Sequence, residues 1–133
     1  MALNPSISPE LKTLMNRLRI ARLLETLPER LTLAKTNNLS HLDFLELLFS
    51  DEVSRRDSDS YTIRARSAQL DPTMVLEYWD NTAEVTYDKQ IFTELVSLRF
   101  IDQAQNVFIL GPVGVGKTFL ATTLGHIACR RHF

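Results

Sequence analysis

The feature that most constrains this chain is the stretch Gly-Pro-Val-Gly-Val-Gly-Lys-Thr at residues 111–118, which matches the pattern G-x-x-x-x-G-K-[S/T] at every position. Three of the four glycines of the chain lie within these residues. Gly114 and Gly116 permit backbone angles that a Cβ disfavours, so successive N–H groups can turn toward one anion. The pattern belongs between a parallel strand and a helix, and therefore predicts an α/β P-loop fold.

The flanking sequences fit that expectation. Residues 106–110, Asn-Val-Phe-Ile-Leu, form a short continuous apolar run that is typical of a buried parallel strand. Apolar residues after Phe119 recur at helical spacing, which predicts a helix from about Lys117. The alternative is an ordinary glycine-rich turn with a solvated lysine and an N-capping threonine.

The motif predicts a nucleotide site because a helix N-terminus presents free N–H groups and a positive dipole end to phosphates. Lys117 is expected to reach the β- and γ-phosphates, and the Thr118 hydroxyl to ligate Mg²⁺. The predicted nucleotide-binding residues are Gly111, Pro112, Val113, Gly114, Val115, Gly116, Lys117 and Thr118.

Hydrolysis needs more than phosphate binding by this loop, because an acidic residue on a second strand must hold Mg²⁺ and another group must orient the attacking water. No Asp or Glu follows Asp102. The run Leu98–Asp102 ends in an acid, but Arg99 interrupts it, and we interpret it as the end of a helix. The sequence therefore predicts no catalytic residue within this chain.

The first seventy residues are expected to form a helical N-terminal region (residues 1–70). Ser8 and Pro9 predict a helix start, and Pro28 is expected to interrupt the helical pattern before a second short helix that ends near Asn37. Ser40 and Asp43 resemble a capping box that opens a strongly apolar helix. Its stripe is wider than one face, which predicts burial or a partner on two sides.

Residues 71–105 are expected to be a linker and a helix that lead into the P-loop region, residues 106–133. A helix is predicted from about Ile91 to Phe100. Tyr78 and Trp79 precede it; they either flank a base or pack between parts of the chain, and we expect packing.

The formal net charge of -1 gives no whole-chain attraction to nucleic acid or membranes. Arg55 and Arg56 lie among acidic residues, so they either contact phosphates or form a solvated helix face. Cys129 is the single cysteine, which excludes an internal disulfide and fits a reducing compartment. We found no signal peptide and no membrane-spanning run, so a cytoplasmic location is expected.

Several blocks of the sequence together resemble the IstB-like ATP-binding proteins, the helper ATPases of bacterial insertion-sequence transposons. The resemblance covers most of the chain, and the helix around Asp-Glu-Val-Ser-Arg-Arg, followed at this distance by the P-loop, makes it specific. The blocks are residues 45–56, 78–80, 95–102, 111–121 and 125–131.

The resemblance implies an AAA+ ATP-binding domain behind a small helical region, related to DnaC-type helicase loaders. It implies ATP and Mg²⁺ as cofactors, self-association of full-length members, and ATP-dependent assembly on DNA that delivers a target site to a transposase. Arg55 and Arg56 would belong to the region that meets DNA or partners. The preference for ATP over GTP rests on the resemblance alone.

Full members of the family continue through further strands that carry the Mg²⁺-binding acids, a sensor residue and an arginine finger. We therefore interpret the chain as the truncated N-terminal part of a longer protein that assists a transposase in DNA transposition. Two alternatives stay open: a remnant that acts as an interaction module without turning over ATP, and a helicase loader of the same superfamily.

Overall fold

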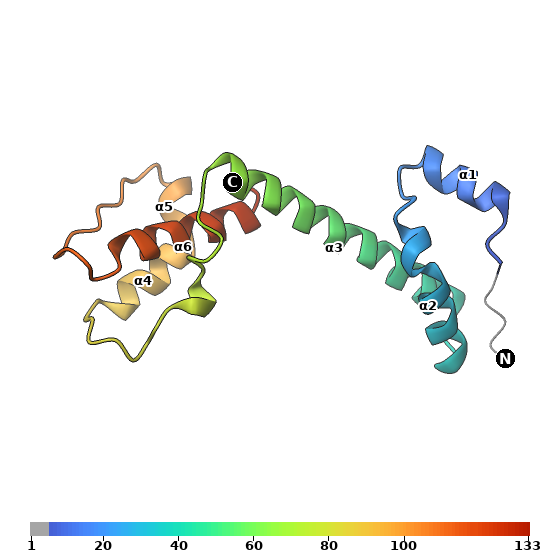
Figure 1. Cartoon of the computed structure of the whole chain (residues 1–133), viewed down its shortest axis with the longest axis horizontal. Coiled ribbons are helices and arrows are strands. Elements are labelled where there is room, and N and C mark those ends of the chain that lie inside the picture. The colour runs from blue at the N-terminus through green and yellow to red at the C-terminus, as the bar shows by residue number, and fades with distance from the viewer. Residues whose placement is uncertain (1–5) are drawn as a thin grey trace. The chain divides into compact units, whose positions relative to one another are not determined.

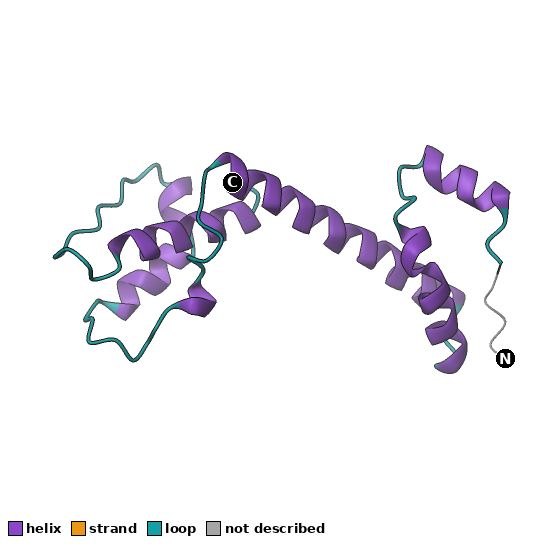
Figure 2. Cartoon of the chain, viewed as in Figure 1, coloured by secondary structure: helices purple, strands orange, loops and turns teal. Residues whose placement is uncertain are grey.

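The computed structural model describes residues 6–133, and these residues are largely helical, as predicted. They contain no strand (Figure 2). The chain divides into unit 1, Met1–Asp57, and unit 2, Ser58–Phe133, with the boundary inside α3. The elements are α1 (Pro9–Arg17), α2 (Leu23–Thr36), α3 (His41–Ser67), η1 (Leu76–Tyr78), α4 (Lys89–Val96), α5 (Arg99–Asp102) and α6 (Lys117–Arg130).

Unit 1 begins with the predicted helix cap. The Ser8 hydroxyl accepts a hydrogen bond from the N–H of Leu11 at 3.2 Å, and Pro9 follows at the first helical position. The capping box at the start of α3 is also confirmed: the N–H of Asp43 donates to Ser40 Oγ at 3.2 Å, and Ser40 N–H donates to Asp43 Oδ2 at 3.3 Å.

The prediction that Pro28 interrupts the helical pattern before a second short helix is wrong, because Pro28 lies inside α2. Leu23 and Leu27 precede Pro28 in α2, and both are buried in the core of unit 1. The free energy gained by burying these leucines on one face offsets the loss of the helical hydrogen bond that proline cannot donate. That core consists of Met15, Leu23, Leu27 and Leu48.

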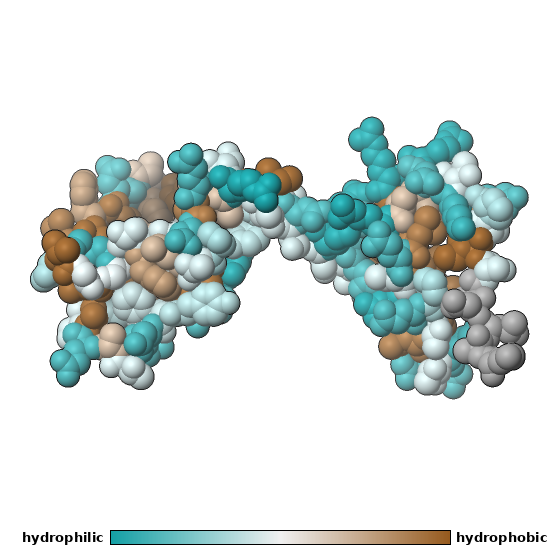
Figure 3. Space-filling model, viewed as in Figure 1, coloured by the Kyte–Doolittle hydropathy of each residue, from teal (hydrophilic) through white to brown (hydrophobic). Residues whose placement is uncertain are grey.

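The apolar stripe of α3 is only partly covered within the chain. Leu48 is buried, whereas Leu42, Leu45, Phe49 and Val53 are exposed. Figure 3 shows hydrophobic side chains on the surface of each unit. The prediction that this helix is well buried is therefore not met by the described residues, and the alternative, a partner on this face, stays open.

In unit 2, α6 packs against α4 (Figure 1). The single helix predicted from Ile91 to Phe100 is instead broken into α4 and α5. The break is at Leu98, which adopts the left-handed conformation with φ of 62° and is only 2% exposed. Asp102 ends α5, so its interpretation as the end of a helix is confirmed.

The predicted strand at residues 106–110 is an extended segment that does not form a strand. A strand exists only when a neighbour pairs with its N–H and C=O groups, and residues 6–133 supply no such neighbour. The segment is also exposed where burial was predicted: Phe108 is 83% and Leu110 is 88% exposed.

Candidate nucleotide site

The loop at residues 111–116 has the backbone conformation that its glycines were predicted to allow. Gly114 and Gly116 have φ of 84° and 93°, in the left-handed region that disfavours residues with a Cβ. α6 then begins at Lys117, as the sequence predicts. A Cβ on Gly116 would lie 2.9 Å from the Trp79 indole, so glycine is also required there for close packing.

The N–H groups around the start of α6 are available to an anion. Within residues 6–133, the backbone N–H groups of residues 113–119 donate no hydrogen bond; the first backbone donor after them is Leu120, to the carbonyl of Gly116. Gly116 occupies the cap position and provides no side-chain acceptor for these groups. Free N–H groups combined with the positive end of a helix dipole suit a phosphate.

The Lys117 ammonium group closes over the loop. Its Nζ donates to the carbonyl of Gly111 at 2.8 Å and to the carbonyl of Pro112. These two bonds tie the lysine side chain back to the first two residues of the loop. The motif predicts a lysine that reaches phosphates, but it does not predict these carbonyl partners.

Thr118 lies exposed in the first turn of α6, where its hydroxyl is accessible to solvent. The loop therefore fits the phosphates of a nucleotide and offers Mg²⁺ one hydroxyl ligand. No cluster of His, Cys, Asp or Glu in the described part of the chain would hold a metal ion. The remaining Mg²⁺ ligands would have to come from phosphate oxygens and water.

The rest of α6 is anchored to the last turns of α3 and to the segment that follows α3. His126 is buried; its Nε2 donates to the Asp71 carbonyl at 2.8 Å, and its Nδ1 lies 2.8 Å from the Tyr61 hydroxyl. Arg64 Nε donates to the Cys129 carbonyl at 2.9 Å. His126 is therefore a packed residue of unit 2, and the Cys129 thiol is buried as well.

Trp79 packs within unit 2 beside the loop, in line with the packing expected for it. Its ring centroid lies 5.4 Å from that of Phe119 and 5.9 Å from that of Tyr87, and Tyr87 in turn lies 5.8 Å from Phe92. Tyr78 is exposed. No periodic pattern in the sequence indicates this aromatic cluster, because its members come from a loop, α4 and α6.

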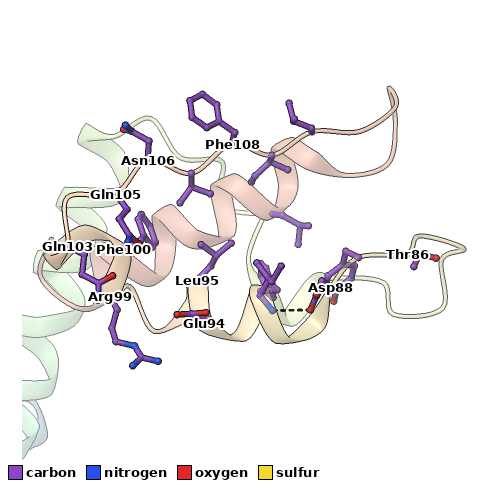
Figure 4. A pocket seen from close by; sticks show the side chains of 17 residues that line it. Thr86, Asp88, Glu94, Leu95, Arg99, Phe100, Gln103, Gln105, Asn106 and Phe108 are labelled. Atoms are coloured by element: carbon purple, nitrogen blue, oxygen red, sulfur yellow. Dashed lines mark hydrogen bonds between the residues drawn. The ribbon is translucent and has the colours of Figure 1, made fainter.

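An open groove of about 610 Å³ lies between α4, α5 and the extended segment before the loop (Figure 4). Leu95 and Phe100 line it from the helices, and Val107 and Ile109 line it from the segment. Phe108 points away from α6. The groove leaves apolar surface uncovered directly before the glycine loop.

Arg55 and Arg56 belong to unit 1 and are engaged by one carboxylate. Glu52 is buried and accepts from Arg55 Nη2 at 2.7 Å and from Arg56 Nε at 2.7 Å, and Arg56 also donates to the Arg19 carbonyl at 2.8 Å. The hydrogen bond from Arg55, aided by that from Arg56 and opposed by burial, lowers the pKa of Glu52 from 4.5 to about 2. The Arg56 side chain keeps about half of its surface exposed, at 52%.

Replacing Glu52 by Gln is expected to lower the free energy of unfolding of unit 1 at pH 7 by about 1–2 kcal/mol, because two guanidinium groups lose their anionic acceptor. The folded pKa is depressed, so the contribution of Glu52 is present above pH 4.5 and is lost as the pH falls toward 2. Urea unfolding followed by helical circular dichroism at pH 7 and pH 3 measures this. Glu52→Gln should lose less stability on acidification than the parent chain.

Glu46→Gln is the matched control, since Glu46 is an exposed carboxylate on the same helix. An equal response of the two variants to acid would show that the Glu52 cluster does not stabilise unit 1.

Among the residues that the structure describes, no helix has both the length and the apolar character needed to cross a membrane.

Comparison with known sequences relates the chain to one family. The family described as "IstB-like ATP binding protein" matches residues 13–133. An insertion-sequence ATP-binding protein of Mycobacterium tuberculosis is 37% identical over 123 residues, which cover 92% of this chain and 49% of the relative. The IS21 ATP-binding protein of Pseudomonas aeruginosa is 34% identical over 116 residues, covering 87% of this chain and 44% of the relative.

The chain thus spans about half the length of the curated relatives it matches. The match extends from α1 through the P-loop to the last residue, and on that ground the chain belongs to the family of IstB-like ATP-binding proteins.

Proposed function

We propose that this chain binds ATP and Mg²⁺ through residues 111–118 and is the nucleotide-binding N-terminal part of an ATPase that assists a transposase in DNA transposition. The observation that carries the proposal is the loop itself: the N–H groups of residues 113–119 are unpaired within residues 6–133, and the Lys117 ammonium lies on the Gly111 carbonyl of the same loop. The names of the relatives, which are insertion-sequence ATP-binding proteins, support the biological setting.

In this proposal each group of the loop has one task. The amides of residues 113–119 hold phosphate oxygens, and Lys117 leaves the Gly111 carbonyl to pair with the β- and γ-phosphates. Thr118 contributes its hydroxyl to Mg²⁺. DNA or partner contact by unit 1 would use the exposed part of Arg56, while Arg55 and Glu52 fix its orientation.

Direct titration with Mg-ATP tests the proposal. Lys117→Ala is expected to weaken binding at least about tenfold, since a charge-assisted contact to phosphate is lost. Lys35→Ala is the matched control, because Lys35 is an exposed lysine in the last turn of α2. If both variants bind Mg-ATP like the parent chain, the loop is not the site.

The chain alone is expected not to hydrolyse ATP above background, because no Asp or Glu follows Asp102 to hold Mg²⁺ or to polarise water. Steady-state phosphate release by the purified chain checks this, with Lys117→Ala as the blank. Release that exceeds the blank and matches a complete AAA+ enzyme would contradict the expectation.

One observation favours a second function for unit 1, that of an interaction module. Leu42 and Val53 are exposed on the apolar stripe of α3, although burying them would be favourable. Such a module would bind its partner equally well with Lys117→Ala, and a transposase-binding assay on that variant separates the two functions.

A further inference from the structure

The extended segment before the glycine loop leaves a row of backbone groups without partners. Within residues 6–133, none of the N–H and C=O groups of residues 106–110 makes a backbone hydrogen bond. Such a row is a template for a second strand, and folded proteins usually cover, twist or charge an edge of this kind. The segment therefore has the hydrogen-bonding capacity to pair with one more strand.

The side chains along this edge are apolar and carry no charge. Phe108 and Leu110 are 83% and 88% exposed. Val107 and Ile109 line the groove that the segment forms with α4 and α5 (Figure 4). Residues 103–110 contain no charged residue and no proline, although charged residues make up 23% of the chain. The charges and prolines with which proteins usually block an exposed edge are thus missing from this segment.

The order of these residues makes the segment complementary to itself. When two copies pair in antiparallel fashion with Phe108 opposite Phe108, Val107 of each copy lies opposite Ile109 of the other, on the face that borders the groove. Asn106 and Leu110 lie opposite each other on the face that carries Phe108. No like charges meet across this ladder, and the net charge of -1 gives two copies little repulsion. A second copy of this chain therefore fits the open edge.

We propose that two copies of this chain associate through residues 106–110, which pair as an antiparallel two-stranded ribbon about a two-fold axis at Phe108. The interface is isologous, because each copy contributes the same residues. A ladder this short buries less than the roughly 1,200 Å² of a stable complex, so we expect a weak dimer with a Kd of about 10–100 µM. The association needs no nucleotide and is independent of the proposed function.

Sedimentation equilibrium of the purified chain across that concentration range tests the proposal, and the parent chain is expected to pass from monomer to dimer. Residue 108 meets its own copy at the two-fold axis. Phe108→Lys and Phe108→Glu should therefore each weaken association at least about tenfold through like-charge repulsion. An equimolar mixture of the two variants should associate again as a heterodimer, because lysine then lies opposite glutamate.

Ile63→Lys is the matched control. Ile63 is an apolar residue of α3 within unit 2 and is 69% exposed, so this variant should dimerise like the parent chain. If the charged variants at residue 108 do not fold, as judged by helical circular dichroism, Phe108→Cys replaces them. Its two thiols meet across the axis, so oxidised glutathione should convert it to a disulfide-linked dimer, whereas Ile63→Cys should stay monomeric.

Three results would overturn the proposal. The first is a parent chain that stays monomeric throughout the concentration range, which would leave the edge to a strand of a different protein. The second is equal dimerisation of the parent chain and Phe108→Lys, which would place the contact elsewhere, such as on the apolar stripe of α3. The third is a mixture of Phe108→Lys and Phe108→Glu that associates no better than either variant alone.

Discussion

Mg-ATP binding should strengthen about a hundredfold when the chain is joined to the part of the Mycobacterium tuberculosis relative that it does not cover. The reason is that neither the loop nor the segment before it is held in place by a neighbouring strand. Residues 106–110 pair with no strand in the described part of the chain, and the Lys117 ammonium holds the loop through the carbonyls of Gly111 and Pro112. A loop that adopts the binding geometry about a hundredth of the time weakens apparent affinity about a hundredfold.

Calorimetry on both chains with Mg-ATP measures the difference, and Lys117→Ala and Thr118→Ala in the extended chain serve as controls for the site. Equal affinities of the short and extended chains would show that added strands do not hold the loop. An extended chain that tolerates Lys117→Ala would overturn the P-loop interpretation itself.

Leu98→Ala is expected to destabilise unit 2 by about 2–4 kcal/mol, because a buried leucine leaves a cavity as well as losing its apolar contacts. Leu98 is among the most buried side chains described, and it sits where the backbone turns from α4 to α5. The left-handed conformation of a leucine costs about 1 kcal/mol, so burial must offset local strain at this residue.

Urea unfolding followed by Trp79 fluorescence reports on unit 2, which contains the single tryptophan. Leu110→Ala is the matched control: this leucine is exposed, and its loss should change stability by less than about 0.5 kcal/mol. Similar midpoints for the two variants would show that Leu98 does not hold α4 and α5 together.

Features with local causes could be predicted from the sequence. The caps at Ser8 and at Ser40 with Asp43 depend on hydrogen bonds between residues three apart, so a short window of sequence contains both partners. The start of α6 at Lys117 follows from the glycines before it. The family could likewise be recognised, because the stretches that resemble it and the spacing between them can be read directly from the sequence.

Features that depend on distant partners could not be predicted. An apolar run such as residues 106–110 becomes a strand only when another strand lies beside it, and periodicity cannot show whether one does. Pro28 and Leu98 occupy conformations that local propensity disfavours, and burial in their units outweighs that propensity. The carbonyl partners of Lys117 depend on loop geometry that no residue pattern specifies.

The two bonds of His126 determine which tautomer its ring adopts. The Asp71 carbonyl can only accept, so Nε2 must carry the hydrogen, and Nδ1 is left to accept from the Tyr61 hydroxyl. The opposite tautomer would set a nitrogen lone pair against a carbonyl oxygen inside a buried site. When the imidazole of α6 is neutral, these two bonds select one tautomer and one orientation, so its two ring nitrogens should be distinguishable as one pyrrole-type and one pyridine-type nitrogen in a ¹⁵N spectrum.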